Sequence, residues 1–245
     1  MSVVLLPAQI PNASGSTFDQ NRGHTRVSRL FDAKSKTMTH DPKECARLFA
    51  EEYSSYFAAD DNNVPIPPLD LRKKSALTSM RFCPALLQRQ LKRMRNYASP
   101  GPDGITYLML KRGGLFLLQQ LSMLFQYCLD RGINPSQWKF AFVIPIFKKG
   151  DRNRLANYRP VSLISCVAKL MEASVRDELL DFCLRNSLLR PSQFGFFPGS
   201  SCFHQLIVYL DKITRSVGEG SCVDAIYLDL AKAFNTVSHL SLIHI

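Results

Sequence analysis

The strongest constraint on the fold is a pair of β-rich runs joined by a charged loop. Phe140 to Phe147 and Tyr158 to Leu163 have the β-branched and aromatic content of buried or half-buried strands. The residues between them include several charged side chains, namely Lys148, Lys149, Asp151, Arg152 and Arg154. The pattern predicts two partner strands connected by a basic, hairpin-like loop.

Helical periodicity surrounds these strands. Apolar residues recur every three or four positions in five stretches, Asp41 to Ala59, Pro84 to Asn96, Leu115 to Leu129, Val167 to Cys183 and His204 to Val217. Asp41 is placed to cap the first helix, because Pro42 and Glu44 follow it in a capping pattern. With a further short strand expected at Val223 to Leu230, the order of elements predicts an α/β (α+β) fold.

Composition divides the chain into three segments. Residues 1–40 mix Pro, Asn, Ser and Gly without a sustained period, which predicts a linker or disordered lead-in. Residues 41–98 are expected to form a helical extension. Residues 99–245 open with the turn-forming sequence Gly101-Pro102-Asp103-Gly104 and then alternate between helices and strands.

The charge balance favours a polyanionic partner. Lys and Arg number 31 against 20 Asp and Glu, for a net charge of +11 and a pI near 9.5. Nucleic acid is therefore the first partner to consider, although the charge equally suits a basic protein that is kept in solution by repulsion. A cluster of cations in the second helix, Arg89, Lys92, Arg93 and Arg95, is expected to be a solvated face more than a phosphate contact.

Cysteine usage and hydropathy predict an intracellular chain, cytoplasmic or nuclear, without a membrane span. The seven cysteines are odd in number and never spaced as CxxC, which argues against a disulfide framework or a zinc site. Met1 to Ile10 lacks a basic start and a cleavage site, and glutamines interrupt the apolar run Leu115 to Leu129.

Several short motifs follow one another in an order that resembles the reverse transcriptases of non-LTR retrotransposons, the LINE and jockey type. They are Ser99-Pro100-Gly101-Pro102-Asp103-Gly104-Ile105, Trp138-Lys139, Ile144-Pro145-Ile146-Phe147-Lys148-Lys149-Gly150-Asp151, Asn157-Tyr158-Arg159-Pro160-Val161-Ser162-Leu163, Lys169 with Glu172, Gln193-Phe194-Gly195-Phe196 with Gly199, Ser200 and Cys202, and Tyr227-Leu228-Asp229-Leu230-Ala231-Lys232-Ala233-Phe234. The resemblance implies the fingers and first part of the palm of a right-hand polymerase.

The resemblance assigns roles to individual residues. Asp229 matches a catalytic carboxylate that binds Mg²⁺ or Mn²⁺ in two-metal nucleotidyl transfer. Lys148 and Arg159 match the cations that hold the incoming triphosphate, and Phe234 matches the aromatic gate beneath its sugar. Residues matching the template-side motif are Gln193, Gly195 and Ser200.

The implied partners are an RNA template, a DNA primer and deoxynucleoside triphosphates. Cations expected near phosphates without individual roles are Lys111, Arg112, Lys139, Lys149, Arg152 and Arg154.

Departures from the family pattern predict that this chain does not polymerise DNA alone. Asn235 replaces a usual acid, and Phe197 stands where an Arg is common. The family's Tyr/Phe-x-Asp-Asp motif lies well beyond the segment that matches Tyr227 to Phe234, and residues 235–245 contain no acid. The last six residues, Leu240 to Ile245, match one frame of a transposon-end sequencing adaptor. Alternatively they continue a family pattern in which Leu follows three residues after His239.

Three other interpretations stay open at this point. The chain is alternatively a non-catalytic nucleic-acid-binding fragment that uses its basic surface alone, with steep salt dependence. It is alternatively a pseudogene product whose incomplete sheet exposes an edge and aggregates. A relative of group II intron or telomerase polymerases is the remaining alternative, which the residues around Gly150 and Tyr158 disfavour.

Overall fold

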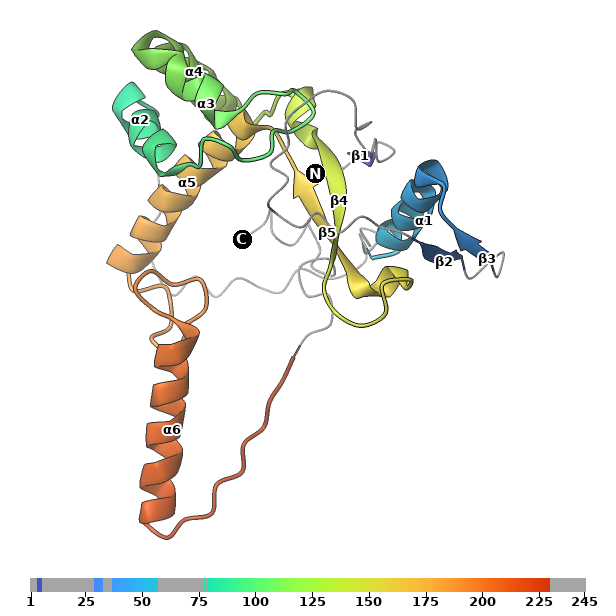
Figure 1. The fold of residues 1–245 in the computed structure, drawn as a ribbon. Helices are drawn as coiled ribbons and strands as arrows, with labels where there is room; N and C mark the ends of the chain where they lie inside the picture. The colour runs from blue at the N-terminus through green and yellow to red at the C-terminus, as the bar shows by residue number, and fades with distance from the viewer. Residues whose placement is uncertain (1–3, 6–28, 33–36, 57–76, 78, 230–245) are drawn as a thin grey trace, which may run out of the picture.

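The computed structural model describes residues 4–5, 29–32, 37–56, 77 and 79–229, which Figure 1 draws in colour. Their elements, in chain order, are β1 (Val4–Leu5), β2 (Leu30–Asp32), β3 (Thr37–Thr39), α1 (Pro42–Ser54), α2 (Pro84–Arg93), α3 (Tyr107–Arg112), α4 (Gly114–Arg131), β4 (Phe140–Phe147), β5 (Tyr158–Leu163), α5 (Cys166–Arg185) and α6 (Cys202–Gly218). Short 3-10 turns precede β4 and β5. This mixture of helices and sheet confirms the predicted α/β class.

The β4–β5 hairpin lies at the centre of the molecule (Figure 1). Phe142 pairs with Leu163 at the base of the hairpin, and Phe147 pairs with Tyr158 next to the loop. Both strands begin and end at the predicted residues. β1 pairs in parallel with the start of β4, which makes a three-stranded sheet in the order β1-β4-β5.

The larger hydrophobic core lies among α2, α4 and α5. Leu87, Phe125 and Leu170, one from each helix, are each 0% exposed. The Phe125 ring meets Phe82 and Trp138 edge-to-face, with centroid distances of 5.4 and 5.9 Å. These contacts are the arrangement that aromatic quadrupoles favour, and they tie the helices to the start of β4.

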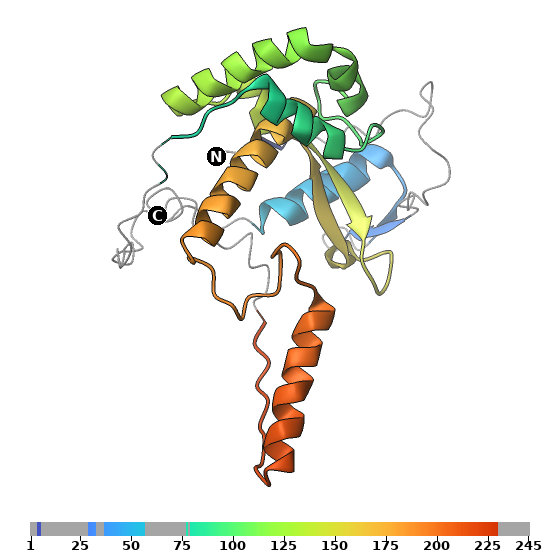
Figure 2. The same ribbon diagram turned by 90° about the vertical axis from the view of Figure 1, so that its left-hand side faces the viewer.

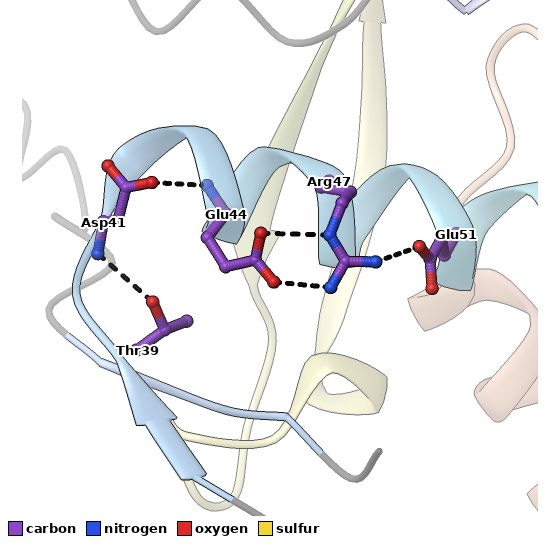
Figure 3. A network of polar contacts seen from close by, with 5 residues as sticks. All are labelled: Thr39, Asp41, Glu44, Arg47 and Glu51. Atoms are coloured by element: carbon purple, nitrogen blue, oxygen red, sulfur yellow. Dashed lines mark hydrogen bonds and ion pairs between the residues drawn. The ribbon is translucent and has the colours of Figure 1, made fainter. Parts of the chain in front are cut away.

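A second core joins α1 to one face of the hairpin. Phe49 of α1 meets Tyr158 of β5 edge-to-face, with ring centroids 5.1 Å apart. The helix begins where predicted, because the Asp41 carboxylate accepts a hydrogen bond of 3.1 Å from the Glu44 amide. On its exposed side, Arg47 bridges Glu44 and Glu51 (Figure 3). α1 therefore uses one face for packing and the other for ion pairs.

α6 projects away from the rest of the molecule (Figures 1 and 2). The Ser201 hydroxyl caps it by accepting a hydrogen bond of 3.2 Å from the His204 amide, and none of its residues is buried. Residues 221–229 turn back from the end of the helix (Figure 2), and the Tyr209 and Tyr227 hydroxyl oxygens lie 2.5 Å apart.

Two predicted helices end earlier than expected. α1 ends at Ser54 instead of near Ala59, and at this end the hydroxyls of Ser54 and Ser55 donate hydrogen bonds to the carbonyls of Ala50 and Glu52, bonds that compete with the helical pattern. α2 ends at Arg93 instead of Asn96. There Lys111 donates a 2.7 Å hydrogen bond to the Met94 carbonyl, a long-range contact that helical periodicity does not encode.

The strand predicted at Val223 to Leu230 is wrong for the described part of that segment. Residues 223–229 are exposed and have no regular secondary structure, because a strand needs a neighbour to complete its ladder of hydrogen bonds and none of the described strands pairs with them. Leu230 lies outside the described residues. Conversely, the sequence predicted no strand in residues 1–40, where the structure has β1, β2 and β3.

Candidate nucleotide and nucleic-acid site

The two faces of the β4–β5 hairpin differ in what covers them. Val143, Phe147 and Tyr158 face the α1 core. Directly opposed residues in an antiparallel pair share a face, so the pairs Ile144–Val161 and Ile146–Arg159 lie together on the other one. Their apolar members Ile144, Ile146 and Val161 are each more than a third exposed. We call the surface formed by Ile144, Ile146, Lys148, Arg159 and Val161 the outer face.

The structure brings Lys148 and Arg159 to this outer face. Lys148 follows Ile146 by two residues, and Arg159 is the cross-strand partner of Ile146, so strand alternation points both cations to the same side. Both side chains are exposed. The backbone between them is fixed, since the Lys148 amide donates a 2.9 Å hydrogen bond to the Asn157 carbonyl. An ammonium and a guanidinium over an apolar platform can bind a phosphate group and the flat base next to it.

The loop at the tip of the hairpin is ordered by its own polar groups. The Asp151 carboxylate accepts a 2.9 Å hydrogen bond from the Asn153 amide, and the Asn157 side chain donates one of 2.7 Å to the Asp151 carbonyl. Gly150 adopts φ +91°, a conformation that side chains disfavour, and a Cβ there would lie 2.8 Å from the side-chain nitrogen Nδ2 of Asn157. The basic loop therefore has a defined shape without a ligand.

Tyr158 anchors this loop from beneath. Its hydroxyl donates a 2.8 Å hydrogen bond to the Arg152 carbonyl, while the Arg152 guanidinium lies 4.7 Å from the centroid of the Phe147 ring. Burial raises the pKa of Tyr158, and the nearby Arg152 charge opposes that rise. The tyrosine is therefore a neutral hydrogen-bond donor at physiological pH. The β2 segment adds a further tie, a 3.0 Å hydrogen bond from the Phe31 amide to the Asn153 carbonyl.

Asp229 is exposed at the end of the described chain. The strand expected at Val223 to Leu230 does not carry it, because residues 223–228 form no strand and are themselves exposed. Phe234 and Asn235 lie outside the described residues. The structure therefore does not place the predicted aromatic gate, and among the described residues no hydrogen bond or ion pair joins Asp229 to Lys148 or Arg159.

The donor set for a divalent cation is incomplete in the described residues. A carboxylate such as Asp229 is the hard oxygen ligand that Mg²⁺ prefers. Within the described ranges, however, no three His, Cys, Asp or Glu side chains gather as a metal-binding group would. Reverse transcriptases in general use divalent metal ions, so Asp229 suits the chemistry but does not by itself make a two-metal site.

The predicted template-side residues occupy an exposed turn between α5 and α6. The Gln193 side-chain amide donates a 3.5 Å hydrogen bond to the Gly195 carbonyl, and the Ser200 amide donates one of 3.2 Å to the Phe197 carbonyl. Phe196 between them has φ +59° and is 97% exposed, which is unusual for a bulky residue. The residue pattern around Phe196 does not predict this conformation.

The Gly101 turn supports the base of the hairpin, a role that the sequence did not reveal. The Gly104 amide closes the predicted turn with a 3.1 Å hydrogen bond to the Gly101 carbonyl. A Cβ on Gly101 would lie 2.5 Å from the Ser165 amide nitrogen, at the junction of β5 and α5. Only glycine permits this approach. The turn therefore fixes the point where α5 leaves the hairpin.

A pocket of about 560 Å³ lies beside α5. Its lining is mainly apolar, with Trp138, Met171 and Leu179 among the contributing residues and Glu172 as its acid. Desolvation by the surrounding protein raises the pKa of Glu172, and the Lys169 charge partly opposes this rise. Lys139, predicted as a phosphate neighbour, also lines this pocket.

The other predicted phosphate neighbours divide into two groups. The first group is exposed: Lys149, Arg152 and Arg154 lie on the hairpin loop, and Arg112 lies at the end of α3. Lys111 is instead engaged within the protein, since its ammonium donates 2.7 Å hydrogen bonds to the Met94 carbonyl and the Asn96 side chain. Lys111 therefore has a structural role.

Each helix in the described part of the chain is too short or too polar to cross a membrane.

Comparison with protein families matches residues 146–245 to the reverse transcriptase (RNA-dependent DNA polymerase) family. The match begins at Ile146 on the outer face and includes Lys148, Arg159, the turn at Gln193 and Asp229. It therefore contains all the residues to which the sequence resemblance assigned a role in the site.

Curated relatives agree with this family match. The chain is 30% identical over 146 residues to a probable RNA-directed DNA polymerase from transposon BS of Drosophila melanogaster, covering 59% of this chain and 16% of the relative. It is 26% identical over 162 residues to the corresponding protein from transposon X-element of the same fly, covering 66% and 18%. The match to the RNA-directed DNA polymerase from mobile element jockey is 30% identical, covering 52% and 14%. The chain thus spans less than a fifth of these relatives. The chain is therefore similar to RNA-directed DNA polymerases of transposable elements, and the reverse transcriptase family model matches its residues 146–245.

Proposed function

We propose that this chain is part of an RNA-directed DNA polymerase of a retrotransposon, and that the outer face of the β4–β5 hairpin binds the incoming nucleotide beside the template. The observation that carries the proposal is the position of Lys148 and Arg159, which lie on one exposed face within the residues that match the reverse transcriptase family. The partners of the complete enzyme would be an RNA template, a DNA primer and deoxynucleoside triphosphates.

In this proposal the hairpin and its supporting helices are the fingers of a right-hand polymerase. Residues 99–245 contribute the fingers and the beginning of the palm, residues 41–98 precede them as a helical extension, and residues 1–40 lead in. Contacts such as Phe49 with Tyr158 cross the proposed boundary at residue 99, so the extension also supports the fingers. The role of these contacts would be to hold the basic loop in one conformation before a ligand binds.

The contact proposed for each side chain follows from its chemistry. Arg159 would grip two phosphate oxygens with its planar fork, and Lys148 would neutralise the triphosphate as a point charge. Ile144, Ile146 and Val161 would pack under the base or template, because they offer an apolar surface beside these cations. Gln193, Gly195 and Ser200 are proposed to contact the template, and Phe234 to exclude a ribose 2′-hydroxyl.

Asp229 is proposed as one oxygen ligand of Mg²⁺ or Mn²⁺, and the cation would supply charge stabilisation for nucleotidyl transfer. The described residues offer no complete ligand group. We therefore propose that the chain by itself does not extend primers, and that activity requires further carboxylates from the remainder of a longer polymerase.

Two measurements test this function. The first is titration of a fluorescent deoxynucleotide triphosphate and of an RNA–DNA hybrid into the chain and into Lys148→Gln and Arg159→Gln. Each variant is expected to weaken triphosphate binding by about tenfold, the typical effect of a lost charge-assisted contact. Lys212→Gln on α6, an exposed cation elsewhere, is the matched control. Equal losses in the control would contradict a site on the outer face.

The second measurement is primer extension on an RNA template with Mg²⁺. It compares the chain, the chain extended by its downstream reading frame, and the extended chain with Asp229→Ala. DNA synthesis by the extended wild type alone would support the role of Asp229. Synthesis by the extended Asp229→Ala variant would contradict it.

A second candidate function is nucleic-acid binding without catalysis, favoured by the combination of a preformed basic loop and an incomplete metal-ligand set. Such binding would involve Lys149, Arg152 and Arg154 and weaken steeply with salt. Absence of synthesis by every extended form, with salt-sensitive binding retained, would favour this candidate.

A further inference from the structure

The surface of α2 is basic and remote from the hairpin loop. Its cations Arg89, Lys92 and Arg93 recur at three- and four-residue spacing, with Arg95 just beyond the helix, and all four side chains are exposed. We call these four residues the α2 basic face. In Figure 1, α2 and the tip of the β4–β5 hairpin lie on opposite sides of α5.

The segment of the chain that carries this face has no acidic residue to neutralise it. Residues 79–102 contain no Asp or Glu, and neither does the neighbouring α3. From α5, Asp177 forms a 2.9 Å ion pair with Arg93, and it also accepts hydrogen bonds from Gln90 and Arg176. Arg89, Lys92 and Arg95 have no such ion pair among the described contacts. The face therefore carries a net positive charge that suits a polyanion.

The opposite side of α2 is already used by the core. Leu87 and Leu91 are 0% and 3% exposed, and both belong to the cluster with α4 and α5. The helix has no apolar face left to insert between lipids, so a membrane surface is a poor partner. Phosphates along a nucleic-acid backbone match the charge without requiring an apolar face.

Tyr97 adds an aromatic ring to this basic surface. It is 90% exposed, although the turn that carries it is held firmly. Lys111 donates hydrogen bonds of 2.7 Å to the Met94 carbonyl and to the Asn96 side chain, and Ala98 packs against the helical core. A single exposed tyrosine is common on protein surfaces. Tyr97, however, lies in a turn of fixed conformation close in sequence to the cations of α2, so its exposed ring can stack on a base.

We propose that the α2 basic face and Tyr97 form a second nucleic-acid-binding site, which takes a single strand and is separate from the outer face of the hairpin. Arg89, Lys92 and Arg95 contact successive phosphates, and a base stacks on the Tyr97 ring. A single strand is favoured over a duplex because only unpaired bases expose the ring face that stacking needs.

Binding of a fluorescein-labelled oligothymidylate, followed by anisotropy over a salt series, tests the site. The triple variant Arg89→Gln, Lys92→Gln, Arg95→Gln is expected to reduce the salt slope by about 2, at roughly 0.7 per lost phosphate contact on single strands. Tyr97→Ala should weaken binding about tenfold, whereas Tyr97→Phe keeps the ring and should bind normally. A control with equal charge loss elsewhere is Arg29→Gln, Lys43→Gln, Lys212→Gln. Equal effects of the two triple variants would overturn the proposal.

Photo-cross-linking locates the contact directly. A 5-iodouridine-substituted oligonucleotide should form an adduct on the Tyr97 peptide, both in the wild type and in Lys148→Gln, Arg159→Gln. Retention of the adduct in that variant separates this site from the outer face, so each proposal can fail alone.

Two outcomes would overturn the proposed α2 site. They are adducts confined to the hairpin, and α2-dependent binding to phosphatidylserine vesicles without oligonucleotide binding. All the substituted side chains are exposed, and the fluorescence of the single Trp138 checks that the core is intact.

Discussion

The helical core and α6 differ sharply in how each is stabilised. In the core, α2, α4 and α5 bury side chains such as Leu87, Phe125 and Leu170 completely. α6 has comparable length and a serine cap at its start, yet it buries no residue. Its apolar residues Phe203 and Leu206 are 68% and 50% exposed. Cap and periodicity are therefore enough to predict a helix, whereas they do not determine what the helix packs against.

Part of the stability of these helices is local, and part comes from tertiary packing. Isolated helices are marginal in water, because most helical stability in proteins comes from packing of the apolar face. The core helices should therefore unfold together in one cooperative transition. α6 should open independently and at a lower free energy.

Truncation of a core side chain should destabilise the protein most. Phe125→Ala should lower the free energy of unfolding by about 3–5 kcal/mol, since it removes a fully buried ring and leaves a cavity beside Phe82 and Trp138. Leu210→Ala in α6, where the side chain is 50% exposed, should change it by less than about 0.5 kcal/mol. Urea denaturation followed by Trp138 fluorescence measures both. Similar losses would mean that α6 is part of the same cooperative unit.

A backbone contact gives the next effect. Gly101→Ala should cost about 1–3 kcal/mol, because its new Cβ would lie 2.5 Å from the Ser165 amide nitrogen. Gly195→Ala is the matched control, since no atom lies within 4 Å of its added Cβ. We expect the control to stay within about 0.5 kcal/mol of the wild type in the same denaturation experiment. An equal cost at the two glycines would contradict the contact at the base of the hairpin.

How far the sequence predicts the structure depends on the range of the contacts involved. The bounds of β4 and β5, the cap of α1 and the long helices α4 and α5 follow from local pattern, and the structure confirms them. Partners distant in sequence were missed, as with Lys111 ending α2 and Gly101 packing on Ser165. Strand alternation would have identified the outer face, because it requires only the register of Ile146 with Arg159. Nothing local marked Phe196 for a left-handed conformation, and the roles of Asp229 and Phe234 stay predictions.

A serine caps α5 in the core, and another serine caps α6. The buried Ser165 hydroxyl accepts hydrogen bonds from the Val167 and Ala168 amides, whereas the exposed Ser201 hydroxyl accepts one from His204. Replacing either serine by Ala should cost about 1 kcal/mol of helix stability. Ser165→Ala should lower global stability in denaturation. Ser201→Ala should only speed amide hydrogen exchange within α6. Global destabilisation by Ser201→Ala would show that α6 is coupled to the core.

The smallest expected effect concerns Glu172 in the pocket beside α5. Desolvation raises its pKa, so the folded state binds this proton more tightly than the unfolded chain does. The ionised carboxylate therefore reduces stability, and the reduction develops as pH rises from the unfolded pKa, about 4.3, through the raised folded value. Glu172→Gln should stabilise the protein at neutral pH by less than about 1 kcal/mol, because the side chain is partly exposed and screened by solvent. The gain should vanish in acid, where both residues are neutral. Denaturation midpoints at neutral pH and at a pH at least one unit below the unfolded pKa measure it, with Glu178→Gln on the same helix as the control. A gain that persists in acid would indicate that packing of the new side chain, and not the charge, is responsible.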